Sequence, residues 1–207
     1  MKKIILIALF SLMMASTAFA FSLVPGSSVT PDGTAPIGGT LVASIVNTPF
    51  SNVWFNGTLT QNVYSNAVGM LFEYQLTNSE SSINKIARLS TTDFTGWTTD
   101  VNSLLGGSLV NPLSIVRDSS GSTLSFNYVS PSGVGVLGQG QTTNWGWIQT
   151  NATAFTWGTS AVIDGGISQV RTYAPTSAVP EPGSFMLLGA GLLGLVGYGK
   201  ARFGRKA

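Results

Sequence analysis

The stretch of residues 40–175 is built from short segments in which apolar and polar side chains alternate. In residues 70–76 every second side chain is apolar, from Met70 to Leu76, and residues 124–129 repeat the pattern. Successive side chains of a β-strand point to opposite faces of the sheet, so this alternation predicts strands with one buried face. A chain with this pattern must pack sheets against each other to cover those faces.

Turn-forming residues separate the segments, as at Asn56-Gly57 and Asp164-Gly165-Gly166. No part of residues 21–180 keeps helical periodicity for three turns, although residues 101–109 suit a brief helix. The expected strands lie at residues 41–46, 58–64, 70–76, 83–89, 94–101, 124–129, 145–149, 154–157, 161–163 and 167–173. This spacing predicts an all-β fold, an antiparallel β-sandwich of the jelly-roll or immunoglobulin-like kind, with a barrel as the alternative.

The sandwich is predicted to occupy residues 40–175. Residues 21–39 precede it and contain Pro25, Pro31 and Pro36 among glycines, serines and threonines. Prolines at this spacing disfavour a helix, so we expect an irregular leader here.

Residues 1–20 have the organisation of a secretory signal peptide. Two lysines precede the apolar residues 4–14, and Ala18 and Ala20 are small residues at the spacing that signal peptidase requires. A retained membrane anchor is the alternative, but the apolar run of about 11 residues is shorter than the roughly 20 that span a bilayer. We expect a signal-peptide helix, export by the general secretion machinery and cleavage after Ala20.

Residues 183–199 form an uncharged run that predicts a transmembrane helix. At about 1.5 Å per residue the run reaches roughly 26 Å, close to the thickness of a bilayer core. A buried core helix is the alternative, but the run is rich in glycine, which costs a helix in water about 1 kcal/mol per residue and is common in membrane helices. The basic tail of residues 200–207 should stay cytoplasmic, and the cations that fix this orientation are Lys200, Arg202, Arg205 and Lys206.

The linker of residues 176–182 contains Pro180, Glu181 and Pro182. Proline lacks a backbone N–H and favours an extended residue before it, so these residues cannot lie inside the helix that follows. They predict an exposed hinge at the membrane surface that a protease can reach.

The order of this hinge, the leucine- and glycine-rich run and the basic end closely resembles the PEP-CTERM sorting signal of exported Gram-negative bacterial proteins. The resemblance implies that an exosortase recognises Pro180, Glu181 and Pro182, and that the chain is anchored transiently in the inner membrane. It also implies delivery to the cell surface or extracellular matrix, in association with exopolysaccharide or biofilm. The family usually ends in clustered arginines, whereas Ala201, Phe203 and Gly204 interrupt the cations here.

Composition narrows the chemistry of the exported part. The chain has no cysteine and no histidine, so we expect no disulfide and no zinc or copper site. The formal charge of +2 comes from the two ends, and residues 21–179 are net acidic, which excludes a basic surface for nucleic acid. We therefore expect no metal, no cofactor, no catalytic residue and no nucleic-acid partner.

Four other functions have partial signals in the sequence. Trp145 and Trp147 should share a strand face, where their rings could stack on a glycan, although packing in the core is the favoured interpretation. A secreted hydrolase would need two carboxyl groups about 5 to 10 Å apart, and none occurs in a recognisable motif. Residues 133–138 fit the pattern G-x-G-x-x-G of dinucleotide-binding sites, but they lack the preceding strand and following helix that such a site needs. Asp118 could contribute to a calcium site, but its sequence context favours a turn.

Overall fold

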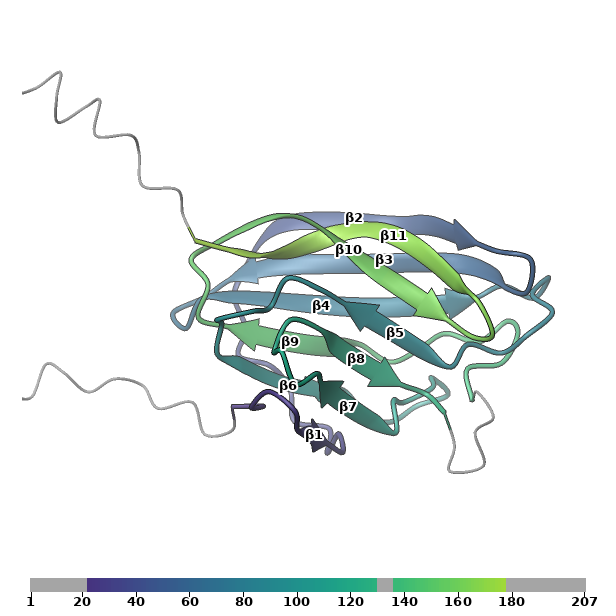
Figure 1. Ribbon diagram of the computed structural model, residues 1–207, viewed down its shortest axis with the longest axis horizontal. Helices are drawn as coiled ribbons and strands as arrows, with labels where there is room; N and C mark the ends of the chain where they lie inside the picture. The colour runs from purple at the N-terminus through teal and green to yellow at the C-terminus, as the bar shows by residue number, and fades with distance from the viewer. Residues whose placement is uncertain (1–21, 130–135, 178–207) are drawn as a thin grey trace, which may run out of the picture. The chain divides into compact units, whose positions relative to one another are not determined.

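The computed structural model describes residues 22–129 and 136–177, which form two stacked antiparallel β-sheets and contain no helix (Figure 1). Eleven strands make up the sheets: β1 (Ser28–Val29), β2 (Thr40–Ser51), β3 (Asn56–Ser65), β4 (Met70–Asn78), β5 (Arg88–Thr91), β6 (Thr99–Ser103), β7 (Ser114–Arg117), β8 (Leu124–Asn127), β9 (Gly146–Thr150), β10 (Ala154–Ile163) and β11 (Ile167–Thr176). The prediction of an all-β antiparallel sandwich is confirmed.

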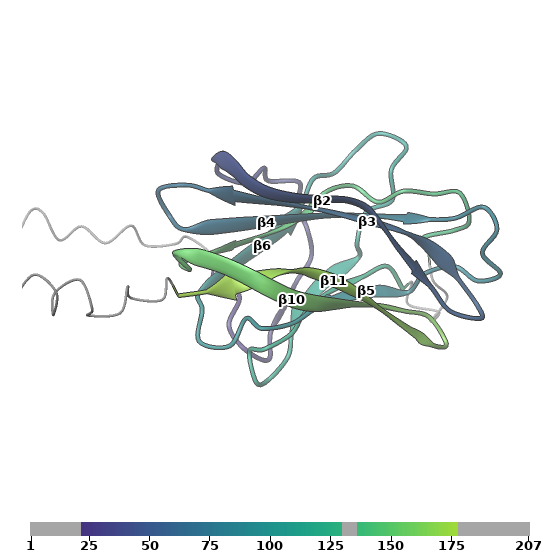
Figure 2. The same ribbon diagram turned by 90° about the horizontal axis from the view of Figure 1, so that it is seen from above.

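The sheets have six and five strands, in the orders β1-β7-β8-β5-β10-β11 and β2-β3-β4-β9-β6. Figure 2 shows the two layers from above, with β2, β3, β4 and β6 in one and β5, β10 and β11 in the other. The chain stays within one sheet from β2 to β4, from β7 to β8 and from β10 to β11, and otherwise crosses between the sheets. Because of these crossings, loops from both sheets gather at each end of the sandwich.

The core lies between the sheets and follows the predicted alternation. Phe72, Tyr74 and Leu76 of β4 are buried and face Leu124 and Phe126 of β8. The rings of Tyr74 and Phe126 lie 6.0 Å apart between centroids. Each buried aromatic ring removes about 150–250 Å² from water, so these side chains dominate the stability of the sandwich.

One side of the sandwich is closed by side chains that bond to strand backbone. Gln61 of β3 donates from Nε2 to the carbonyl of Tyr173 and accepts from its N–H, at 2.8 and 2.6 Å. Ser168 of β11 bonds in the same two-sided way to the backbone of Ser51, at 3.1 Å in each direction. These bonds satisfy the backbone groups of Ser51 on β2 and Tyr173 on β11, at one position of each outer strand.

The other side is closed by the segment expected to be an irregular leader. Leu23 is buried, and its N–H donates to the carbonyl of Thr99 on β6 at 2.7 Å. Five residues later the chain forms β1, which pairs with β7 in the opposite sheet. Strand β1 was not predicted, because a two-residue strand has no measurable alternation of apolar and polar side chains.

The other departures from the predicted strands have local causes. Residues 154–157 and 161–163 belong to one strand, β10, which pairs with β11 without a break at Gly158. A Cβ at Gly158 would come within 2.6 Å of the Ala174 side chain, so glycine lets this strand continue here. The segment expected at residues 83–89 is a strand only from Arg88 onward. Residues 101–103 end β6 instead of beginning a brief helix, and β7 was not anticipated.

The predicted signal-peptide helix of residues 1–20, the transmembrane helix of residues 183–199 and the tail of residues 200–207 lie outside the described residues. Within residues 22–129 and 136–177, no helix is long and apolar enough to cross a membrane.

Candidate functional site

The residues predicted to direct sorting lie outside the part of the chain that the structure describes. They are Ala18, Ala20, Pro180, Glu181, Pro182, Lys200, Arg202, Arg205 and Lys206. Strand β11 ends at Thr176, so residues 177–179 alone separate the last strand from Pro180. The proposed recognition site therefore follows the folded domain with almost no spacer.

Trp145 and Trp147 do not form an exposed pair. Trp147, on β9, is 3% exposed, and its indole Nε1 donates to the carbonyl of Thr34 at 3.0 Å. Trp145 precedes β9 and is half-buried. Trp147 therefore offers no open aromatic face, which stacking on a sugar ring needs, and it packs within the fold.

The reason is the path of the leader. Trp147 pairs with Glu73 on the outer face of its sheet, whereas Ile148 beside it points into the core. Residues of the leader cross this outer face, where Thr34 accepts from Trp147 and Ile37 accepts from the Asn66 side chain at 3.1 Å. Strand alternation placed Trp147 on a face but carried no information about the segment that covers it.

Trp157 is the more exposed alternative, at 47%, on the outer face of β10. Its indole stacks on Tyr173, with centroids 4.3 Å apart and planes at 24°. The guanidinium of Arg171 lies 3.9 Å from the indole centroid. The Trp157 ring thus already has an aromatic and a cationic stacking partner within its own sheet.

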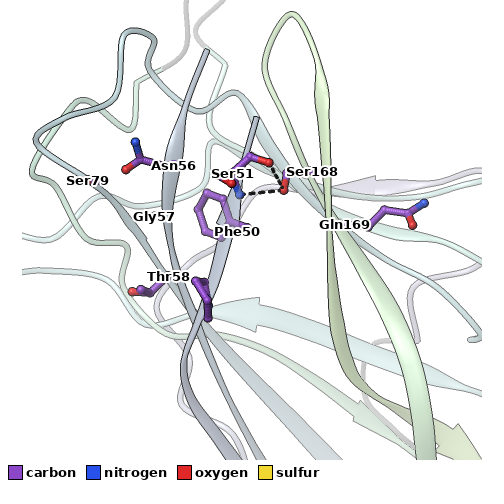
Figure 3. Close-up of a pocket in the computed structure, with 9 residues that line it drawn as sticks. Phe50, Ser51, Asn56, Gly57, Thr58, Ser79, Ser168 and Gln169 are labelled. Carbon is purple, nitrogen blue, oxygen red and sulfur yellow. Dashed lines mark hydrogen bonds between the residues drawn. The ribbon is translucent and has the colours of Figure 1, made fainter. Parts of the chain in front are cut away.

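A shallow groove of about 580 Å³ lies where β2 ends, β3 begins and β11 begins (Figure 3). Its lining residues are all uncharged: Pro49, Phe50, Ser51, Asn56, Gly57, Thr58, Ser79, Ser168 and Gln169. Figure 3 shows the bonds between Ser51 and Ser168 on one wall of the groove. These residues offer amide and hydroxyl hydrogen bonds but no group that could act as a general acid or base.

Two aspartates are committed to local structure. Asp118 accepts from the Ser120 hydroxyl at 2.7 Å and from the Thr123 N–H at 3.0 Å, and these bonds lower its pKa. Asp32 accepts from the Thr34 N–H and from Asn102, and these bonds lower its pKa to about 2. Asp118 thus stabilises its own turn, and among the described residues no cluster of three acidic, histidine or cysteine side chains could hold a metal ion.

Glu73 and Asp100 have shifts in the opposite direction. Burial raises the pKa of Glu73, and a hydrogen bond from the Tyr64 hydroxyl only partly opposes this. Burial also raises the pKa of Asp100, on β6. The two side chains are carried by different strands, with β9 lying between β4 and β6.

The most elaborate polar arrangement in the described part of the chain is formed by Arg117, which the sequence analysis did not single out. Arg117 is 3% exposed. Its guanidinium donates to Thr99 Oγ1 and to the carbonyls of Leu23, Phe94, Trp97 and Gly121 at 2.9–3.1 Å. Burial lowers its pKa, and Asp118 opposes the shift, so the group stays charged and ties the leader to two loops.

Comparison with known proteins identifies the C-terminal segment. The model of the PEP-CTERM protein-sorting motif matches residues 178–202, which contain Pro180, Glu181, Pro182 and the first two cations of the tail. No curated protein and no solved structure matches the chain. The match confirms the resemblance seen in the sequence. The chain is a PEP-CTERM domain-containing protein, and its sorting motif is that of an exported, membrane-transiting protein that depends on an exosortase.

Proposed function

We propose that the β-sandwich is a non-enzymatic cargo domain that is delivered to the cell surface or extracellular matrix, in association with exopolysaccharide or biofilm. The observation that carries this proposal is the sorting motif at residues 178–202, which follows directly after β11. In this proposal the motif supplies the destination, and the sandwich supplies a stable body without disulfides.

The roles within the motif follow from the chemistry of its parts. Pro180, Glu181 and Pro182 form the extended hinge that the exosortase recognises, because prolines keep the backbone out of a helix. Residues 183–199 hold the chain in the inner membrane, and Lys200, Arg202, Arg205 and Lys206 keep its end cytoplasmic. Signal peptidase cleaves after Ala20.

The non-enzymatic part of the proposal is supported by how the polar groups of the sandwich are used. Asp32 and Asp118 cap local turns, and the buried Arg117 is saturated by neutral acceptors. The groove in Figure 3 has an uncharged lining. Each of these arrangements serves the fold.

Intact-mass analysis of membrane and extracellular fractions tests the processing. The wild-type chain should begin at Phe21 and end close to Pro180 once it has been processed. Glu181→Gln should accumulate in the inner membrane with residues 200–207 intact, whereas Glu80→Gln, a change at an exposed glutamate outside the motif, should behave as wild type. An extracellular wild-type chain that retains residues 200–207, or equal processing in cells without exosortase, would refute the proposal.

A further inference from the structure

A small hollow lies on the side of the sandwich where the leader joins the two sheets. It has a volume of about 200 Å³ and is lined by Ser22, Leu23, Ser28, Val29, Asp100 and Val101. β1 contributes one wall and β6 the other. The lining offers apolar side chains and a single charged group, the carboxylate of Asp100.

Asp100 has no cationic partner among the described residues. The charged group that acts on it is Asp32, a second carboxylate, which together with burial raises the pKa of Asp100. A partly buried carboxylate beside another carboxylate is an unfavourable arrangement that a nearby cation would relieve. The hollow is therefore complementary to an apolar group that carries a positive charge.

The chain itself leads into this hollow. Leu23 is fixed by its N–H bond to Thr99 and by the bonds that its carbonyl accepts from Arg117 and Thr99, at 2.9 and 3.2 Å. Ser22, the residue directly before Leu23, lines the hollow, so the hollow is within reach of Phe21. After cleavage at Ala20, the only residue that precedes Ser22 is Phe21.

We propose that the hollow is the docking site of the N-terminus that signal peptidase creates, with the Phe21 ring between β1 and β6 and the new α-ammonium group paired with Asp100. The inference rests on the processing described under the proposed function. An apolar cavity of about 150 Å³ holds a benzene ring, so the hollow has the right size for this side chain. Before cleavage the Phe21 nitrogen is an uncharged amide, and the pair with Asp100 cannot form.

Docking of the new N-terminus means that signal-peptide cleavage adds a contact to the folded domain. The ion pair exists between the pKa of Asp100 and that of the amine, ordinarily about 8. An opposite charge within about 4–6 Å lowers the pKa of a carboxyl by about 1–3. The uncleaved chain therefore leaves Asp100 unpaired, and the cleaved chain holds its N-terminus against the edge of β6.

The test uses residues 21–207 in detergent micelles, prepared by removing a tag so that Phe21 is the first residue. The same chain with an acetylated α-amino group is the matched control. Carboxyl ¹³C NMR, assigned with Asp100→Asn, should show that the free amine lowers the titration midpoint of Asp100 by about 1 or more. The midpoint of Asp118, which is tied to its own turn, should not move.

Nuclear Overhauser contacts provide the second measurement. The Phe21 ring should contact the methyl groups of Val29 and Val101 in the chain with the free amine. Equal Asp100 midpoints in the two chains, or absence of these contacts, would overturn the docking site. Because this chain is made without a signal peptide, those outcomes are independent of export. An exported chain that begins at another residue would instead overturn the cleavage site and, with it, Phe21 as the natural occupant.

Discussion

Replacing Arg117 by methionine should be among the most damaging single changes to the sandwich. Methionine has a similar length and no charge, so it keeps most of the apolar packing of the side chain. The change removes one donor from each of the carbonyls of Leu23, Phe94, Trp97 and Gly121. These carbonyls belong to the leader and to the two loops that precede β6 and β8.

The magnitude follows from these acceptors. Leu23 keeps the Thr99 hydroxyl as a donor and Phe94 keeps the Trp97 N–H, so the carbonyls of Trp97 and Gly121 are the two left without a donor among the described residues. Leaving one buried acceptor without a donor costs about 1–3 kcal/mol, and two such losses would sum to about 2–6 kcal/mol. Two effects reduce the sum, because the variant no longer buries a cation and because water can reach loop carbonyls after small movements. We expect a loss of about 3 kcal/mol in the free energy of unfolding, a large share of the 5–15 kcal/mol of a typical domain.

Urea unfolding of the full chain in detergent, followed by tryptophan fluorescence, measures this loss. Arg171→Met is the matched control, since Arg171 is exposed on β11 and contacts Trp157 through its guanidinium. An exposed cation–π contact contributes about 0.5–1 kcal/mol, so the control should be only slightly destabilised. If the two variants unfold within about 1 kcal/mol of each other, the structural role assigned to Arg117 is wrong.

Three further changes test other parts of the structure. Gly57→Ala should destabilise the chain by about 1–3 kcal/mol in the same assay, because a Cβ there would lie 2.0 Å from a backbone carbonyl oxygen, whereas Gly38→Ala, in open space, should be neutral. Trp147→Phe should cost about 1–3 kcal/mol, because the carbonyl of Thr34 loses its donor, and an unchanged midpoint would contradict this contact. Burial raises the pKa of Glu73 above its ordinary 4.5, so ionisation of Glu73 opposes folding. The melting temperature of Glu73→Gln should therefore lie above that of wild type at pH 7 and equal it at pH 3, where Glu73 is protonated. A melting temperature of the variant below wild type at pH 7 would refute the direction of this effect.

The fold class and the sorting motif could be predicted from the order of residues along the chain. The alternation in residues 70–76 correctly placed Phe72, Tyr74 and Leu76 in the core, because side-chain direction in a strand depends only on position along it. The sorting motif could also be predicted from the sequence, because it is defined by the order of a hinge, an apolar run and a basic end along the chain. The match to the motif model confirms that prediction.

Tertiary structure alone decided what happens to Trp147, Arg117 and the leader. The bond between Trp147 and Thr34 joins residues 113 positions apart, and the bond between Arg117 and Leu23 joins residues 94 apart. Periodicity tells which face a side chain occupies but not which distant segment will cover that face. For this chain the sequence determined the β-sandwich class and the sorting motif. Only the packing of the leader across β6 and β9 showed which segment buries Trp147 on the outer face of its sheet.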